Sequence, residues 1–358
     1  MPSAPTLVAL QERYLLNKLI GQGDNSSVYR AMDMEERQVV AVKRYDQRLR
    51  RDVRFVAHFR REARLASALD HPHVHRVLSY GYADDVYYTV SSYARGGNLE
   101  PLLQVGRGAV PTETMRVFVE VCAGLGYIHQ QGLLHRNLKP ANVLLHSDGR
   151  AVVADVGLTH QVGSSELTMT VATLGAITYY SPEHILGKSL SPASDIYAMG
   201  LMLYQACTGR LPFVAVSPLA LARQQLRDAP PPPRSLNPDV SPALEAIVLR
   251  CLEKSAAARY ASAHDLAEML ALCPESAGLQ ALPVPVAAPA PPLAVMSETP
   301  GTILAGAGGA TDHGRGGATA RTGVHLPTVR LSATRGAVWR TLHRDLLCLL
   351  IGSDDDTL

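Results

Sequence analysis

The segment of this 358-residue chain that best predicts its fold reads His135-Arg136-Asn137-Leu138-Lys139-Pro140-Ala141-Asn142. It places a cation, Lys139, and two amides, Asn137 and Asn142, within a few residues. Asp155 follows the apolar run 151–154 further along the chain. Protein sites hold magnesium through oxygen ligands together with phosphate, and a lysine binds phosphate as a point charge. These residues therefore indicate a site for a polyphosphate and its magnesium.

A glycine-rich turn lies near the N-terminus. Gly21-Gln22-Gly23-Asp24-Asn25-Ser26 is flanked by the β-like runs 14–20 and 27–32. Glycines permit a tight turn and a close approach of backbone N–H groups to phosphate. A plain hairpin is the more frequent meaning of such a turn by itself. The next predicted strand, 39–43, ends in Lys43, and this lysine favours the phosphate-binding interpretation.

The rest of the pattern is mainly helical. Apolar residues recur at helical spacing in several segments, and 195–208 is apolar nearly all round, which predicts a buried helix. Asp195 is a candidate cap at the start of that helix. A further strand is expected over 87–93, ahead of the break Arg95-Gly96-Gly97-Asn98. The predicted helices are 51–69, 112–130, 195–208, 243–253 and 262–272.

Together these features resemble the protein kinase family, in its bacterial serine/threonine type. The family's catalytic loop reads His-Arg-Asp-Leu-Lys-Pro-x-Asn, and this chain differs from it only at Asn137. The resemblance covers roughly 14–272 and implies an α+β, bilobal fold with a small β-rich N-lobe and a helical C-lobe. Further matches in family order are the glycine-rich turn, Lys43, Glu62, Asp155-Val156-Gly157, Ser181-Pro182-Glu183, Asp195 and Arg259.

The resemblance also implies ATP and Mg²⁺ as cofactors, with roles that the general phosphoryl-transfer template supplies. Lys43, held by Glu62, would orient phosphates, Lys139 would steady the γ-phosphate, and Asn142 and Asp155 would hold the metal. Without the resemblance, Glu62 is an ordinary surface ion-pair residue and each apolar position is plain core. Asp195 would brace the catalytic loop, Glu183 would pair with Arg259, and Ser91 would be the gatekeeper. The implied nucleotide-binding positions are Gly21, Gln22, Gly23, Ser26, Val28, Ala41, Lys43, Ser92, Ala94 and Leu144.

Three departures from the family lie close together. Asn137 replaces the aspartate that receives or orients the proton of the substrate hydroxyl, and general-base catalysis is worth about 10²–10⁴-fold. Ala176 replaces a threonine that normally bonds to that aspartate, and Val156 replaces a phenylalanine. Two functions stay open: a signalling serine/threonine protein kinase with weakened transfer, or a nucleotide-binding pseudokinase that regulates or scaffolds without catalysis. A weaker third is a kinase domain whose linker and tail recruit a tethered partner.

Partners follow from the same resemblance: ATP, and a protein substrate or signalling partner. The segment 159–177 carries Thr168, Thr170 and Thr173, which we expect an upstream kinase to phosphorylate, with Arg136 available to bind the phosphate. An ordinary polar loop is the alternative interpretation of this segment.

The domain organisation expected from the sequence is an N-terminal extension over 1–13 and a kinase domain over 14–273, with N-lobe 14–93 and C-lobe 94–273. A segment rich in Ala, Pro and Gly, 274–330, predicts a disordered linker that spans on the order of 40 Å. The tail, 331–358, contains the short amphipathic run 337–351. We favour a short helix that docks on the domain or frays there over a peptide for a partner groove or a membrane surface.

Composition limits the other classes of protein to which the chain could belong. Hydrophobic residues make up 47%, enough for a sizeable core, and the net charge of +2 indicates no nucleic-acid partner. The five cysteines include no CxxC spacing, so a metal or disulfide framework is not expected. We find neither a signal peptide nor an apolar run long enough to span a membrane. The expected location is cytoplasmic.

Overall fold

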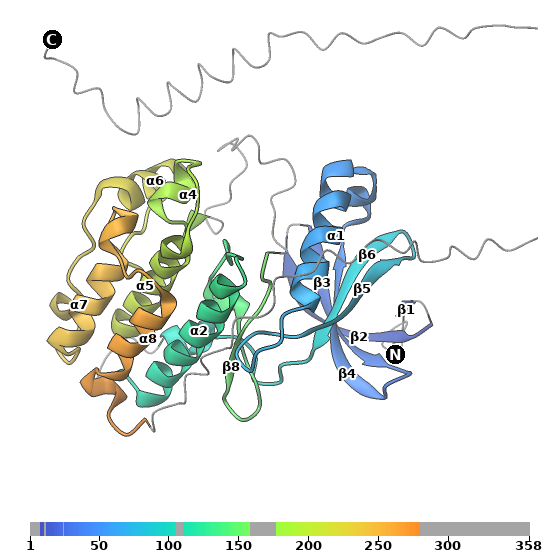
Figure 1. The fold of residues 1–358 in the computed structure, drawn as a ribbon, viewed down its shortest axis with the longest axis horizontal. Coiled ribbons are helices and arrows are strands. Elements are labelled where there is room, and N and C mark those ends of the chain that lie inside the picture. Colours follow the sequence, from blue (N-terminus) through green and yellow to red (C-terminus); the bar gives the residue numbers. More distant parts are fainter. Residues whose placement is uncertain (1–7, 11, 24, 105–109, 158–176, 280–358) are drawn as a thin grey trace, which may run out of the picture. The chain divides into compact units, whose positions relative to one another are not determined.

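The computed structural model of the chain describes residues 8–10, 12–23, 25–104, 110–157 and 177–279. Figure 1 shows this part as a strand-rich N-lobe followed by a helical C-lobe, which is the bilobal α+β fold expected from the sequence. Most of the predicted linker (280–330), the tail, the three threonines of 168–173 and Ala176 lie outside the described residues. The start of the predicted linker is ordered instead, because 274–276 form a 3-10 helix and the buried Ser276 donates its hydroxyl to the carbonyl of Leu270 at 2.7 Å. No helix in the described ranges has the length and apolar character needed to cross a membrane.

The N-lobe is built on one antiparallel sheet with the strand order β1-β2-β3-β4-β6-β5. The glycine-rich turn joins β2 to β3, and Lys43 lies near the end of β4. The apolar residues on one face form a core around Val40, Val42 and Val90. The strands are β1 Val8–Leu10, β2 Tyr14–Gly23, β3 Ser26–Asp33, β4 Gln38–Tyr45, β5 Val77–Ala83 and β6 Val86–Ser92.

Strand β5 is an element that the sequence analysis missed. It pairs with β6 through the turn Asp84-Asp85, in which both residues have positive φ, 48° and 64°. A two-residue turn of this kind matches the twist of a hairpin and favours Asp, Asn and Gly. The two adjacent aspartates between β-like runs were therefore the signal that could have revealed the hairpin.

Helix α1, Val53–Ser67, begins where the side chain of Asp52 accepts hydrogen bonds from the backbone N–H groups of Arg54 and Phe55. Its buried face carries Phe55 and Phe59, four residues apart. The Phe59 ring centroid lies 4.9 Å from that of Tyr87, on β6. These aromatic contacts attach α1 to the sheet and so determine where Glu62, one turn further along, is placed.

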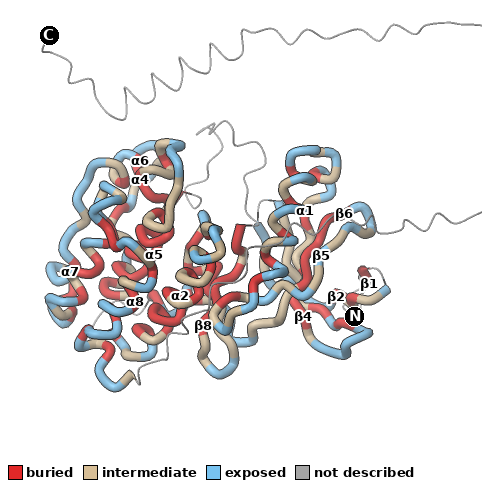
Figure 2. Tube along the Cα trace, in the orientation of Figure 1, coloured by how far each residue is buried: buried red, intermediate tan, exposed pale blue. Residues whose placement is uncertain are grey.

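The C-lobe surrounds α5, whose residues are nearly all buried (Figure 2). The predicted helix over 112–130 is confirmed with the same bounds. Asp195 is not the cap of α5, because Ser191 caps that helix and Pro192 begins it. The α-helices are α2 Thr112–Gln130, α4 Pro182–Ile185, α5 Pro192–Thr208, α6 Pro218–Arg227, α7 Pro242–Cys251 and α8 Ala263–Ala271.

Short elements complete the described fold. Strands β7 and β8 form a small antiparallel pair directly after the loop 135–142. Their bounds are Val143–Leu145 and Ala151–Val153. The short 3-10 helices are η1 Gln47–Arg51, η2 Glu100–Gln104, η3 Pro140–Asn142, η4 Pro233–Ser235, η5 Ala256–Ala258 and η6 Pro274–Ser276.

The two lobes meet where the segment between α1 and β5 runs against β8. His75 donates its backbone N–H to the carbonyl of Val153 at 2.8 Å, and Val153 donates to the carbonyl of His73 at 2.9 Å. Gly124 of α2 faces the same carbonyl of His73, which a Cβ at this position would approach to 2.3 Å. Glycine therefore permits this close contact, which brings the sheet's Lys43 near the residues that follow β8.

Candidate functional site between the lobes

The loop 135–142 is held by one buried carboxylate in the first turn of α5. Asp195 accepts hydrogen bonds from the backbone N–H groups of His135 and Arg136, both at 2.9 Å, and lies 2.8 Å from Nε2 of His129. Burial opposes the ionisation of Asp195, but the hydrogen bonds from the His129 side chain and from the His135 backbone lower its pKa. The charged carboxylate therefore positions the start of the loop.

His129 is a positioning residue that the sequence analysis missed. It lies in the last turn of α2, and the one signal in the sequence is that a histidine suits a helix C-terminus. Arg136, the second residue of the loop 135–142, has a φ of 65°. A non-glycine residue in this region is strained. The bond from its N–H to Asp195 is one of the contacts that stabilise this conformation.

The side chain of His135 joins the loop to the end of β8. It is fully buried, and its Nε2 lies 2.8 Å from the carbonyl oxygen of Ala154. Nδ1 accepts a hydrogen bond from the N–H of Asn137 at 3.3 Å, so Nε2 carries the proton. Burial lowers the pKa of His135, which favours this neutral form. The loop and Asp155, the residue after Ala154, are thus held close together.

Asn142 makes a second connection at the same place. Its Nδ2 donates to the carbonyl oxygen of Asn137 at 2.8 Å, and its own carbonyl accepts from the N–H of Ala154 at 2.8 Å. The side-chain amide of Asn137 and the ammonium of Lys139 make no hydrogen bond with any residue that the structure describes. Both groups therefore remain available to a ligand.

Lys43 and Asp155 form the charged centre of the site. Lys43 Nζ lies 2.8 Å from Asp155 Oδ2, and the two side chains are 13% and 31% exposed. Burial acts against the charged forms of both residues. Their attraction outweighs it, so the pKa of Lys43 is raised and that of Asp155 is lowered. Asp155 has a φ of 60°, a strained backbone conformation often found at functional sites.

Glu62 does not hold Lys43, contrary to the expectation from the sequence. Its Oε1 lies 3.7 Å from Nδ1 of His58, one turn earlier on α1, and the ammonium of Lys43 is bonded to Asp155. The other carboxylate oxygen, Oε2, rests against Gly157, where a Cβ would come within 2.2 Å of it. The physical reason is where α1 places Glu62: its carboxylate lies over Gly157, the glycine that follows Val156, whereas Asp155 lies within hydrogen-bond distance of the Lys43 ammonium.

This contact leads to a prediction for Gly157→Ala. Gly157 has a φ of 68°, so alanine there would carry the left-handed strain of about 1–2 kcal/mol as well as a clash with Glu62. Gly187→Ala is the matched control, since Gly187 has a φ of 62° and no atom near its missing Cβ. We expect Gly157→Ala to lower the free energy of urea unfolding by about 1 kcal/mol more than Gly187→Ala.

The difference between the two alanine variants should disappear when Glu62 is also changed to alanine, because only the contact with Glu62 separates them. An equal loss in both variants with Glu62 present would show that this carboxylate does not lie over Gly157.

Three of the positions implied for a nucleotide, Val28, Ala41 and Lys43, share one face of the sheet, whereas Gln22 and Ser92 lie on the other face. Register pairs Gly21 with Val28 and Val28 with Lys43, and Ala41 lies two residues before Lys43. Because strand side chains alternate between faces, Val28, Ala41 and Lys43 point to the same side. Leu144 lies on β7, and an isolated bridge pairs it with Asn98 in the segment that follows β6.

At the end of β6, hydrogen bonds within the protein limit which backbone groups are free to bind the base of a nucleotide. The N–H of Ser92, an implied nucleotide-binding position, donates to the carbonyl of Arg76 at 3.2 Å, so this N–H is not free for a ligand. Ala94 lies after the strand, and its backbone has no hydrogen bond to a described residue. Of the two implied positions, Ala94 therefore keeps a free backbone donor and acceptor.

The ion pair expected between Glu183 and Arg259 is formed, at 2.7 Å. The Arg259 side chain is fully buried and also donates to the carbonyl oxygens of Ala193 and Glu253, both at 2.8 Å. Ser194 donates its hydroxyl to Glu183 at 2.7 Å. These bonds attach the short helix α4 to the start of α5, the same helix end that carries Asp195.

Known proteins show the same organisation. The family model of the protein kinase domain matches residues 14–270. A probable serine/threonine-protein kinase of Streptomyces coelicolor is 39% identical over 73% of this chain and 40% of its own length. The serine/threonine-protein kinase PknB of Mycolicibacterium smegmatis is 35% identical, over 72% of this chain and 42% of its own length. The chain thus spans about two fifths of the curated relatives that it matches.

A solved structure agrees with these matches. The kinase domain of Mycobacterium tuberculosis PknI superposes with a TM-score of 0.58 and 25% sequence identity. The superposition covers 75% of this chain and 98% of that domain. The two lobes described above are therefore the architecture of a complete kinase domain in a solved relative.

Proposed function

This chain belongs to the protein kinase family, and we propose that its site between the lobes binds ATP and Mg²⁺ but transfers phosphate to protein serine or threonine only slowly. The observation that supports this proposal is the combination at one site of Lys43, Asn142 and Asp155 with Asn137. The first three supply charge and metal ligands, whereas Asn137 lacks the carboxylate that would accept a proton.

The residues present fit a magnesium ion. Asn142 uses its Nδ2 for the carbonyl of Asn137, which leaves the side-chain oxygen Oδ1 unused. Asp155 uses Oδ2 for Lys43, which leaves Oδ1 unused. An amide oxygen and a carboxylate oxygen are ligands that Mg²⁺ accepts beside phosphate and water. Bound magnesium would neutralise charge that develops on the phosphates.

Four side chains of the site have separate roles in this proposal. Lys43 attracts phosphate oxygens, and Asp155 holds its ammonium in place until they arrive. Lys139, free of partners in the described part of the chain, attracts the terminal phosphate. Asn137 can donate or accept a hydrogen bond at the substrate hydroxyl, but its neutral amide does not remove a proton at ordinary pH. Positioning and charge neutralisation are therefore retained while proton transfer is lost.

A second candidate function is favoured by the same asparagine. A protein that binds nucleotide without transferring phosphate can act as a regulatory or scaffold module in signalling, through the shape that the nucleotide stabilises. Ala176 supports this candidate from the sequence, since it removes the partner that normally accompanies the missing aspartate. The two functions differ only in whether any transfer to protein takes place.

Nucleotide binding can be tested by thermal unfolding. Mg-ATP at about 100 times its Kd should stabilise the full-length chain by about 2.7 kcal/mol, a shift of several degrees in Tm. Lys43→Met should reduce the shift, since it removes the phosphate-binding cation. Asp155→Asn should weaken its dependence on magnesium. Lys188→Met is the control, because Lys188 is exposed and distant in sequence from the site.

The control variant should keep the shift of the wild type. If millimolar Mg-ATP leaves Tm of the wild type unchanged while the chain is folded, neither proposed function stands.

A further inference from the structure

The outer face of helix α1 carries positive charge that the described part of the chain does not balance. Residues 51–67 contain five arginines and two carboxylates, a net charge of +3, whereas the whole chain has a net charge of +2. All five arginines are exposed, and their side chains make no ion pair or hydrogen bond with a residue that the structure describes. These residues are Arg51, Arg54, Arg60, Arg61 and Arg64.

The two carboxylates of this stretch have other partners. Asp52 accepts hydrogen bonds from the backbone N–H groups of Arg54 and Phe55. Glu62 lies against Gly157, on the side of α1 that borders the site between the lobes. Among the contacts of the described residues, neither carboxylate therefore neutralises an arginine side chain of α1.

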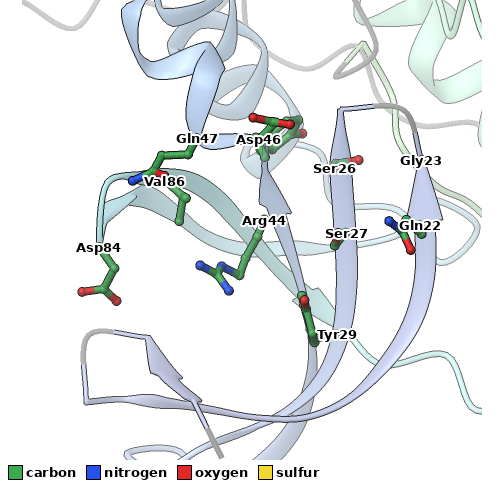
Figure 3. Close-up of a pocket in the computed structure, with 11 residues that line it drawn as sticks. Gln22, Gly23, Ser26, Ser27, Tyr29, Arg44, Asp46, Gln47, Asp84 and Val86 are labelled. Atoms are coloured by element: carbon green, nitrogen blue, oxygen red, sulfur yellow. The ribbon is translucent and has the colours of Figure 1, made fainter.

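Two arginines of η1, directly before α1, do have acidic partners. Arg48 binds both carboxylate oxygens of Asp46, at 3.0 Å and 2.7 Å. Arg50 pairs with Asp85 of the β5–β6 turn. Figure 3 shows Asp46 where the chain leaves β4. Positive charge next to the sheet is thus balanced within the fold at these two arginines, in contrast to the exposed arginines of α1.

Helical periodicity gathers the exposed arginines on one side of α1. Phe55 and Phe59 belong to the face that packs on the sheet. Arg54, Arg61 and Arg64 lie on the opposite face, at spacings of seven and three residues. Exposed stretches of α1 are pale blue in Figure 2. The helical rise of about 1.5 Å per residue separates Arg54 from Arg64 by about 15 Å along the axis.

These dimensions and charges suit an extended acidic peptide. In an extended chain the residues on one side are about 7 Å apart, so three alternate carboxylates span about 13 Å. That span is close to the length of the arginine-lined face. A guanidinium binds a carboxylate through two parallel N–H bonds, so each arginine can hold one glutamate or aspartate of the peptide.

Other anionic partners suit this face less well. Proteins that bind single-stranded nucleic acid add aromatic side chains on which bases stack, whereas Phe55 and Phe59 of α1 are buried. Helices that lie on a membrane insert an apolar face, whereas the apolar face of α1 packs on the sheet. Val53, 81% exposed, is the one large apolar side chain that α1 presents to solvent. A peptide segment is therefore the favoured occupant.

We propose that the outer face of α1 binds an extended acidic segment of a partner protein. Carboxylates of the segment pair with Arg54, Arg61 and Arg64, the three arginines opposite the packed face. The same helix carries Glu62 to Gly157, so the partner contacts the element that borders the site between the lobes. The interaction requires no nucleotide and is independent of the proposed function.

The test measures fluorescence anisotropy of a labelled peptide that alternates glutamate and serine, with both ends blocked, as the full-length chain is added. A matched peptide has glutamine in place of glutamate. We expect the glutamate peptide to bind at least about tenfold more tightly, because each exposed charge pair contributes up to about fivefold in affinity. Arg54→Glu combined with Arg61→Glu should abolish this preference.

Two controls locate the binding on α1. Arg223→Glu combined with Arg227→Glu makes the same change of charge at exposed positions of α6 and should bind as the wild type does. A peptide with lysine in place of glutamate should bind the α1 double variant more tightly than it binds the wild type. A variant that had failed to fold would not show this gain.

Three results overturn the proposal. The first is equal binding of the glutamate and glutamine peptides by the wild type. The second is an equal loss of affinity in the α1 and α6 double variants. The third is tighter binding of single-stranded DNA, or of vesicles that contain phosphatidylserine, than of the glutamate peptide. No nucleotide is added in these measurements, so none of the outcomes depends on whether the chain binds ATP.

Discussion

Asn137→Asp should raise the rate of phosphate transfer to protein by about 10²–10⁴-fold, the range that general-base catalysis contributes. The backbone of Asn137 donates to His135 and accepts from Asn142, and neither bond uses its side chain. Aspartate has the same shape as asparagine, so the loop should keep its conformation while gaining a proton acceptor. The measurement is the rate of radiolabelled phosphate transfer from Mg-ATP, by autophosphorylation and to a generic protein substrate.

Two controls accompany this experiment. Asn17→Asp makes the same chemical change at an exposed position of β2 and should leave the rate unaltered. Adding Asp155→Asn to Asn137→Asp should abolish the gain, because the restored base needs the charged site to act on. A wild type that already transfers phosphate as fast as Asn137→Asp would contradict our interpretation of Asn137. A gain that appears only after Ala176→Thr is added would assign the defect to both positions.

The membership of the kinase family was predictable because it rests on residues whose chemistry and order are local. Asp195 and the pair Glu183–Arg259 make the contacts that the resemblance implied. Their partners are backbone groups of one loop, or a single buried counter-ion, so few alternative arrangements satisfy them. A buried arginine leaves little choice, since each unpaired donor would be unfavourable.

The partner of Lys43 was not predictable in the same way. Two carboxylates, Glu62 and Asp155, compete for one ammonium, and the sequence does not show which lies closer. That choice depends on how α1 packs on the sheet through Phe55 and Phe59, and on the strained backbone of Asp155. The contact of Glu62 with Gly157 arises from the same packing. Tertiary positions of this kind are determined by the summed contacts of many residues rather than by a motif.

Hairpin β5–β6 illustrates a different limit of prediction from the sequence. The strand was missed because its alternation is carried by Leu78, Tyr80 and Tyr82, whose side chains are exposed. Apolar residues on the outer face conceal the inward and outward alternation that predicts a strand.

Arg259→Met should lower the free energy of unfolding by about 3–5 kcal/mol, the usual cost of removing one partner from a buried ion pair. The change leaves Glu183 without its counter-ion and the carbonyls of Ala193, Glu253 and Lys254 without their donor. Arg250→Met is the matched control. Arg250 is exposed and lies over the ring of Tyr260 at 4.2 Å, an interaction worth about 1 kcal/mol or less. Urea unfolding monitored by circular dichroism gives both values.

The pH dependence of the free energy of unfolding shows whether the ion pair with Glu183 causes the loss of stability in Arg259→Met. Burial favours the neutral form of Glu183, but the hydrogen bonds from Arg259 and Ser194 outweigh it and lower its pKa to about 2, from 4.5. A carboxylate with a lowered pKa stabilises the fold above its unfolded pKa, and this contribution of about 3 kcal/mol is lost as the pH falls through 4.5 towards 2. Wild type should therefore lose stability between about pH 5 and pH 3, and Arg259→Met should lose much less over that interval. An equal loss in both proteins would mean that Glu183 is not held in its charged form by Arg259.

Combining Glu183→Gln with Arg259→Met tests the same ion pair in a second way. The double variant should lose less free energy of unfolding than the sum of the two single variants, because the unpaired charge that each single change leaves is absent from it.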